Sequence, residues 1–346
     1  MNMNAGIKGI DDAFAAAKQH GRAVLIPYIC GGYDSPAKTV AILLAMQKGG
    51  ANIIELGIPC ANPFADGDTI KESHKIAIEK GTTGMRDCLL ILETARSQGL
   101  AVPVILMGYY SSLVEEYHFN VDKMCQDAAM SGANGFLVVG IEEGTQEFTF
   151  NSVCYKYNLS SIPLVQPGSS DGRIATLAGM ASTFLYVVSS KGKTGTRDAL
   201  PKDLDNEVAR VRAKTDLPLV VGFGISNPEM VKRVSSLSDG AVVGSFLTDC
   251  IGIKNEGKLP DEDVIYQKVL YLKSGTIKVK VDAKNQAVKI PSASTSVNES
   301  PVFRLGLGQN HTSCFSFHVK FSKIRSVVSV WPRIKNKNKP FLSEKV

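Results

Sequence analysis

Two carboxyl groups, Glu55 and Asp66, lie where a buried segment gives way to a loop. Glu55 interrupts the apolar run of residues 52–58, and Asp66 follows a loop that Pro59 and Pro63 force on the chain. A carboxylate at the end of a buried strand must be paired, shifted in pKa or used in chemistry. Two carboxyl groups in different environments suit general acid–base catalysis. In the structural alternative, which spacing alone leaves open, Glu55 bonds to backbone and Asp66 caps a helix.

Glycine and hydroxyl residues gather after three later apolar runs, at residues 192–196, 222–226 and 244–245. Glycine lets backbone N–H groups approach a phosphate, and a short helix beginning near Ser245 would direct its positive end toward that anion. The clustering therefore predicts a phosphate site, with tight turns of no further function as the alternative. Residues 192–194 do not belong to a Walker A loop, because Val187 occupies the required glycine position.

Three tyrosines, Tyr109, Tyr110 and Tyr186, stand at or just past the ends of predicted strands. Their rings face either the mouth of a site or a core, and the sequence leaves both readings open. The histidines, His74 among them, show no metal-ligand spacing to one another, and no serine lies in a Gly-x-Ser-x-Gly turn. The sequence therefore favours neither a metal centre nor a serine hydrolase.

Eight short apolar runs alternate with amphipathic segments between residues 24 and 245. They cover residues 24–30, 52–58, 103–109, 135–140, 161–167, 183–190, 217–224 and 240–245. Eight strand–helix units in roughly 250 residues predict a (β/α)8 TIM barrel, in which catalytic groups lie at the C-terminal ends of the strands. The alternative is a doubly wound open sheet, but no Gly-x-Gly-x-x-Gly follows the first run to support it.

Helical periodicity fills the segments between these runs. Ala37, Val40, Ala41 and Leu44 recur at the spacing of one helix face, and the glycine pair at 49–50 is typical of a helix C-terminus. Further helices are predicted over residues 86–98, 121–131, 204–213 and 261–272. The last of these would complete the outer layer of the barrel.

The composition is that of an ordinary globular protein, with 44% hydrophobic and 21% charged residues. No window approaches the ~18 uninterrupted apolar residues of a transmembrane helix. The first residues resemble neither a signal peptide nor a transit peptide. The seven cysteines are scattered without framework spacing, which indicates reduced thiols. We therefore expect a cytoplasmic protein without membrane contact.

The positive charge is concentrated at the C-terminal end. The net charge is +6, from 39 Lys and Arg against 33 Asp and Glu. Residues 273–346 hold 14 of the basic and 3 of the acidic residues, a net +11, which leaves −5 for residues 1–272. A basic tail can bind nucleic acid, but a poorly ordered linker is the interpretation we favour. We expect a barrel domain over 1–272, a tail over 273–346 and no nucleic-acid partner.

Several phrases resemble the tryptophan synthase alpha chain family. They are Glu55-Leu-Gly-Ile-Pro, Asn62-Pro-Phe-Ala-Asp66-Gly, Leu106-Met-Gly-Tyr-Tyr, Gly222-Phe-Gly-Ile-Ser and Val243-Gly-Ser. The resemblance runs in order over about residues 6–252, and its phrasing is closest to the fused alpha–beta form. It implies a (β/α)8 barrel that cleaves indole-3-glycerol phosphate to indole and glyceraldehyde 3-phosphate in tryptophan biosynthesis.

The resemblance also implies roles for individual residues. Glu55 would be the general acid–base that protonates the indole ring carbon and helps deprotonate the glycerol hydroxyl. Asp66 would accept the indole N–H, and Thr194 would belong to a loop that closes over the site and bonds Asp66. Tyr186 would lie in the substrate pocket near Glu55, and we expect Tyr28 and Tyr109 there as well. The phosphate-binding positions would be Gly195, Gly224, Gly244 and Ser245.

In this family the alpha chain needs no cofactor or metal, and pyridoxal phosphate belongs to a beta-chain partner that receives indole. This sequence departs from the family where that partner is met or signalled to. Asn62 and Gly140 each stand where the family usually has aspartate. We therefore expect the lyase chemistry to be retained and the coupling to a beta chain to be weak.

Two other functions remain open on the sequence. The chain could be a catalytically weakened alpha-like barrel that only binds a phosphorylated ligand or a beta chain. It could also be a different barrel enzyme that acts on a phosphosugar, since one fold hosts many reactions. The paired carboxyl groups within an indole-type motif argue against the latter.

Overall fold

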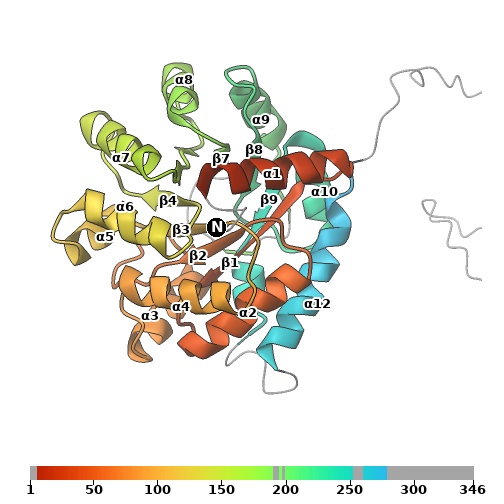
Figure 1. The fold of residues 1–346 in the computed structure, drawn as a ribbon. Helices are drawn as coiled ribbons and strands as arrows, with labels where there is room; N and C mark the ends of the chain where they lie inside the picture. Colours follow the sequence, from red (N-terminus) through yellow and green to blue (C-terminus); the bar gives the residue numbers. More distant parts are fainter. Residues whose placement is uncertain (1–5, 190–194, 197–198, 252–259, 279–346) are drawn as a thin grey trace, which may run out of the picture. The chain divides into compact units, whose positions relative to one another are not determined.

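The computed structural model describes residues 6–189, 195–196, 199–251 and 260–278 (Figure 1), all within one compact unit. The strands are β1 Val24–Cys30, β2 Ile54–Gly57, β3 Val104–Tyr109, β4 Gly135–Val139, β5 Ser160–Ser161, β6 Leu164–Val165, β7 Leu185–Val188, β8 Leu219–Gly222 and β9 Gly240–Val243. The helices are α1 Gly6–Gln19, α2 Pro36–Lys48, α3 Asp68–Glu79, α4 Met85–Ser97, α5 Tyr110–Glu116, α6 Val121–Met130, α7 Thr145–Lys156, α8 Asp171–Met180, α9 Leu204–Arg212, α10 Pro228–Leu237, α11 Ser245–Thr248 and α12 Asp261–Lys273. None of them is long and apolar enough to cross a membrane.

The strands are all parallel and follow the order β5-β4-β3-β2-β1-β9-β8-β7-β6. The two outermost strands of this order, β5 and β6, are consecutive in the chain and together occupy the fifth position of the barrel. Pro163 separates them because it has no N–H to donate. The Ile162 N–H nevertheless donates to the Phe136 carbonyl, and Pro163 accepts from the Tyr186 N–H. The ring closes through this segment, which confirms the predicted (β/α)8 barrel.

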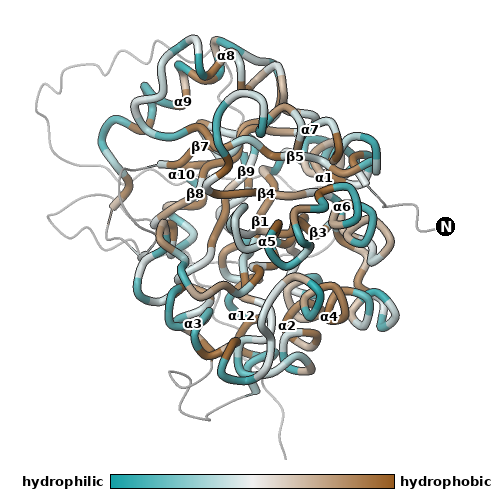
Figure 2. Tube along the Cα trace, turned by 90° about the vertical axis from the view of Figure 1, so that its left-hand side faces the viewer, coloured by the Kyte–Doolittle hydropathy of each residue, from teal (hydrophilic) through white to brown (hydrophobic). Residues whose placement is uncertain are grey.

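Two apolar cores hold the barrel together. Side chains that point inward from the strands pack with α1, which covers the N-terminal end of the barrel. Phe14 of α1 lies 5.4 Å from Phe184, measured between ring centroids. The larger core fills the space between the strands and the surrounding helices. Figure 2 shows hydrophobic residues concentrated in the strands and hydrophilic residues along the outer turns.

The predicted helices are confirmed, and so are the glycines that end them. Gly50, Gly99 and Gly132 adopt positive φ just after α2, α4 and α6. The predicted face of α2 is only partly the buried one, because Val40 is buried but Ala37 is exposed. The other buried residues include Thr39, Ile42, Leu43 and Met46. This helix packs against both α4 and α12. Its apolar residues therefore face neighbouring helices as well as the strands. For this reason the periodicity of the sequence does not identify the face that points toward the strands.

Packing against the barrel continues past α12. A 3-10 turn over Ser274–Thr276 follows, and Thr276 is fully buried. Its carbonyl accepts a hydrogen bond of 2.8 Å from the Ala23 N–H at the start of β1. Ile277 forms an isolated bridge with Arg22. The first residues beyond our expected domain boundary at 272 therefore belong to the barrel.

Candidate active site

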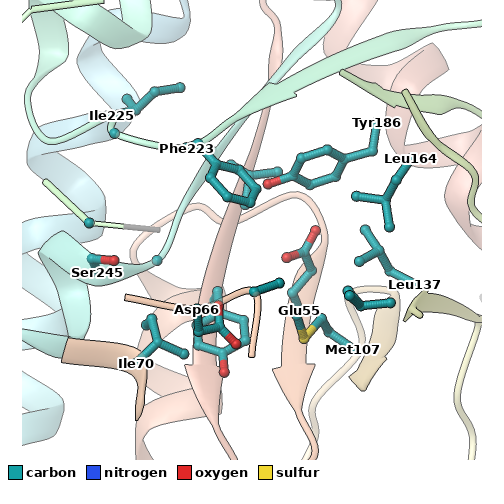
Figure 3. A pocket seen from close by; sticks show the side chains of 17 residues that line it. Glu55, Asp66, Ile70, Met107, Leu137, Leu164, Tyr186, Phe223, Ile225 and Ser245 are labelled. Atoms are coloured by element: carbon teal, nitrogen blue, oxygen red, sulfur yellow. The ribbon is translucent and has the colours of Figure 1, made fainter. Parts of the chain in front are cut away.

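A pocket opens at the C-terminal ends of the strands, where the barrel architecture places catalytic groups (Figure 3). It encloses about 680 Å³, the space at its mouth included. Its lining includes most of the residues that the sequence predicted for the site: Tyr28, Glu55, Asp66, Tyr186, Gly195, Gly224, Gly244 and Ser245. Thr194 lies outside the described residues. Tyr109 is next to the pocket but not in its lining.

Glu55 reaches the pocket from β2, where it is in register with Tyr28 of β1 and Ile105 of β3. Its side chain is 3% exposed, and among the described residues no donor lies within hydrogen-bonding distance of Oε1. Burial raises the pKa of this carboxyl group to about 8. At neutral pH the group therefore carries a proton that it can donate, which is the property of a general acid.

Asp66 lies on the loop between β2 and α3 and is 2% exposed. Its Oδ2 accepts a hydrogen bond of 2.6 Å from the Tyr109 hydroxyl at the end of β3. The cap residue of α3 is Gly67, with no side-chain cap bond, so Asp66 does not occupy the N-cap position of the structural alternative. The Tyr109 ring meets Phe64 edge-on, with the ring centroids 4.9 Å apart. Tyr109 thus holds the Asp66 carboxylate in place from a position outside the pocket lining.

The side chains of Tyr28 and Tyr186 each cross a neighbouring strand over a glycine. A Cβ on Gly57 of β2 would lie 2.3 Å from the Tyr28 hydroxyl oxygen, and one on Gly222 of β8 would lie 1.7 Å from that of Tyr186. Any larger residue would displace the ring. These glycines therefore allow two hydroxyl groups to reach the pocket, and Figure 3 shows the hydroxyl end of Tyr186 above the Glu55 carboxyl group.

His74 of α3 is a buried polar residue that the sequence analysis considered only as a possible metal ligand. It is fully buried, its Nδ1 accepts a 3.1 Å hydrogen bond from the Cys60 N–H, and its Nε2 lies 3.3 Å from the Tyr28 hydroxyl. Burial lowers its pKa to about 4, so the ring is neutral at pH 7. Its position four residues after Ile70, on the inner face of an amphipathic helix, was the available signal.

The opposite rim of the pocket consists of loops after β8 and β9. Phe223 and Gly224 both have φ of +82°, an uncommon conformation for phenylalanine. The Ser189 hydroxyl donates to the Phe223 carbonyl at 2.8 Å and holds this turn. After β9, Gly244 precedes α11, which begins at Ser245 as predicted. Within this short helix the N–H groups of Leu247 and Thr248 donate to the Gly244 carbonyl, which leaves those of Ser245 and Phe246 to face a ligand.

Apolar side chains form the remaining wall of the pocket. Met107, Leu137 and Leu164 contribute from β3, β4 and β6, and Phe223 and Ile225 come from the loop after β8. The sequence analysis did not single out these residues, although the alternation of inward and outward side chains in each strand was the available signal. A wall of this kind suits a flat aromatic group placed beside the two carboxyl groups.

Fold and pocket together define a (β/α)8-barrel protein with a candidate acid–base site at the C-terminal ends of its strands. The sequence model of the tryptophan synthase alpha chain family matches residues 14–276. The chain belongs to the tryptophan synthase alpha chain family, lyases that cleave indole-3-glycerol phosphate to indole and glyceraldehyde 3-phosphate.

Individual relatives agree. The chain is 35% identical over 266 residues to the tryptophan synthase alpha chain of Chloroflexus aurantiacus, which covers 76% of this chain and 96% of that one. It is 40% identical over 249 residues to tryptophan synthase of Saccharomyces cerevisiae, covering 72% of this chain but only 34% of that longer protein. The solved tryptophan synthase subunit alpha of Legionella pneumophila superposes with a TM-score of 0.69 at 30% identity, over 77% of this chain and 97% of that one.

Proposed function

We propose that this chain itself cleaves indole-3-glycerol phosphate, with Glu55 and Asp66 as its acid–base groups. The observation that carries the proposal is the Glu55 carboxyl group, which is buried at the pocket with a pKa raised to about 8 and one oxygen without a donor among the described residues. A stable core seldom keeps such a group. A reaction that needs a proton donor at neutral pH accounts for it.

Glu55 begins the reaction by donating its proton to the indole ring carbon that carries the glycerol chain. The ring becomes cationic, and its N–H turns more acidic. The Glu55 carboxylate then takes the proton of the adjacent alcohol while the carbon–carbon bond breaks. The bonding electrons return to the ring, so that indole leaves and the alcohol carbon becomes the aldehyde of glyceraldehyde 3-phosphate. Glu55 ends the cycle protonated.

Asp66 accepts the indole N–H and stabilises the cationic ring. The support for this role is its burial at the pocket and its bond from Tyr109, which fixes the carboxylate orientation. A fixed carboxylate stabilises developing positive charge without reorganising during the reaction. The apolar wall, with Leu137 and Leu164, would hold the indole ring against it.

The phosphate group would bind at the rim formed by Gly195, Gly224, Gly244 and Ser245. All four residues line the pocket, and the described lining residues include no lysine or arginine. Backbone N–H groups would therefore supply much of the attraction there, as they do at phosphate-binding loops and helix N-termini.

A tryptophan synthase beta chain is the partner that this family membership suggests. Asn62 and Gly140 are both exposed on loops at the pocket end of the barrel. Phe64, on the same loop as Asn62, is 53% exposed, and its ring approaches the other loop, since a Cβ on Gly140 would lie 3.2 Å from it. A partly exposed aromatic side chain is a common anchor at protein interfaces.

A direct assay tests the proposed reaction. Purified chain is incubated with indole-3-glycerol phosphate, with and without a beta chain, and indole release is followed. We expect turnover by the parent and a loss of about 10²–10⁴-fold in Glu55→Gln and in Asp66→Asn, the range for removal of an acid–base group. Binding of substrate without release of indole would instead identify a barrel that only binds its ligand.

A further inference from the structure

We infer that His74 is a positioning residue that fixes the Tyr28 hydroxyl as a hydrogen-bond donor to the substrate alcohol whose proton is removed. The inference rests on the proposed lyase reaction. It concerns two residues on different elements, Tyr28 on β1 and His74 on α3, that meet behind the pocket. It also assigns a role to the buried histidine, which the acid–base chemistry of the carboxyl groups leaves unused.

The hydrogen bonds settle which nitrogen of His74 carries the proton. The Cys60 N–H donates to Nδ1 at 3.1 Å, so Nδ1 must hold a lone pair. A neutral imidazole with an acceptor at Nδ1 carries its hydrogen on Nε2. Nε2 lies 3.3 Å from the Tyr28 hydroxyl oxygen and therefore donates to it. The tyrosine oxygen accepts in this bond, and its own proton points elsewhere.

The Tyr28 proton is available to a ligand. Among the described residues, the buried Cys30 thiol, two residues along the same strand, lies within reach of the Tyr28 hydroxyl, and sulfur is a weak acceptor. Tyr28 itself lines the pocket and is 5% exposed. An alcohol oxygen of a bound substrate would replace the thiol as acceptor and form the stronger hydrogen bond. Donation from His74 to the same oxygen would strengthen that bond further.

The position of the Tyr28 ring between Gly244 and Gly57 indicates which substrate oxygen its hydroxyl group would contact. One edge of the ring lies by Gly244, since a Cβ there would be 3.4 Å from Cδ1, and the hydroxyl lies over Gly57, two residues after Glu55. A substrate with its phosphate at Gly244 and its indole ring at the carboxyl groups lays its three-carbon chain along this ring. The hydroxyl then meets the alcohol next to the indole. That oxygen gains negative charge as Glu55 removes its proton, so a donor there is stronger in the transition state than in the ground state.

Two replacements of His74 separate its two bonds. Asparagine places an acceptor near the position of Nδ1 and keeps the bond from Cys60 but removes the donor to Tyr28. Glutamine reaches further and places a donor near the position of Nε2. Tyr117→Phe is the matched control, because the Tyr117 hydroxyl is buried without a hydrogen-bond partner among the described residues and lies outside the pocket lining.

The experiment measures kcat and KM for indole release by the full chain and its variants, with melting temperatures to confirm folding. We expect Tyr28→Phe to lower kcat by about tenfold or more, as for loss of one transition-state donor, and KM by far less. His74→Asn should match it, His74→Gln should recover much of the loss, and Tyr28→Phe with His74→Asn should be no worse than Tyr28→Phe alone. Parental kcat in Tyr28→Phe, or multiplying losses in the double variant, would overturn the inference while leaving the lyase intact. A parent no more active than Glu55→Gln would overturn the proposed function and this inference with it.

Discussion

The Tyr109 hydroxyl donates a hydrogen bond of 2.6 Å to Oδ2 of Asp66, and both side chains are almost completely buried. The bond joins the end of β3 to the loop after β2, so it holds that loop closed over the barrel. A short bond to a buried carboxyl group fixes its position more firmly than a contact with water would. The orientation of Asp66 is therefore set by a residue outside the pocket lining.

Replacing this tyrosine tests its role in positioning Asp66. We expect Tyr109→Phe to lower kcat by about 10–100-fold, because a hydrogen bond to a charged group contributes roughly 1.5–3 kcal/mol. Tyr110→Phe is the control, since the ring of Tyr110 packs edge-on against Phe150. Steady-state kinetics of indole release would decide, and equal turnover in both variants would refute the positioning role.

The raised pKa of Glu55 gives a prediction about stability. Between about pH 4.5 and 8 the folded chain keeps the Glu55 proton while the unfolded chain has lost it, so the free energy of unfolding falls as pH rises through this window. Glu55→Gln removes the effect. We expect the variant to be more stable than the parent at pH 8, by on the order of a few kcal/mol, and the gain to shrink toward pH 5.

Urea denaturation at pH 5 and pH 8 measures this difference. Glu79→Gln is the control, because Glu79 is an exposed glutamate on α3, with its side chain 61% accessible. The prediction fails if Glu55→Gln differs from the parent in stability by the same amount at both pH values. That result would show that burial does not raise the pKa of Glu55.

The phosphate rim predicts protection by small anions. Inorganic phosphate or glycerol 3-phosphate at ten times its dissociation constant should add roughly 1.4 kcal/mol to the free energy of unfolding and raise the melting temperature by about 2–6 °C. Ser245→Asp should abolish the protection by placing a like charge in the rim. Ser236→Asp on the exposed side of α10 should retain it. Equal protection of both variants would place the anion elsewhere.

The packing of residues 274–278 makes two truncations behave differently. Deletion of residues 279–346 should leave melting temperature and turnover close to those of the full chain. Deletion from residue 274 removes the fully buried Thr276 and the carbonyl that pairs with the Ala23 N–H. We expect that shorter chain to lose about 1–3 kcal/mol for the unsatisfied donor and more for the lost packing. Equal melting temperatures for the two truncations would contradict this.

Activation of this chain by a beta chain should be weak, and restoring the two aspartates should increase it. Allosteric coupling is typically ~1–3 kcal/mol, and the loss of charge at two loops can remove most of it. We expect Asn62→Asp combined with Gly140→Asp to increase the activation of indole release by saturating beta chain. Gly140→Ala is the control for backbone strain, because Gly140 has φ of +78°. Strong activation of the unaltered chain would refute the expectation.

The sequence predicted the barrel and both carboxyl groups because each leaves a local trace. Glu55 breaks an apolar run, and glycines follow the amphipathic segments that form helices. The support for these groups left no such trace. Tyr109 and Asp66 are far apart in the chain, and only the register of β2 against β3 brings them together. His74 appears in the sequence as one more polar residue of a helix, and its value depends on which strand the helix covers.

Pro163 gives the ring of strands a seam. At the fifth position only two residue pairs join β5 to β4 and two join β6 to β7, whereas β3 and β4 share five. Opening the barrel there breaks fewer backbone bonds than separating β3 from β4, so amide hydrogens near Ser161 and Val165 should exchange with solvent before those of β3 and β4. Leu164, in the middle of the seam, lines the pocket. Brief separation of the seam would therefore give the deep, apolar end of the pocket a second route to solvent, away from the phosphate rim.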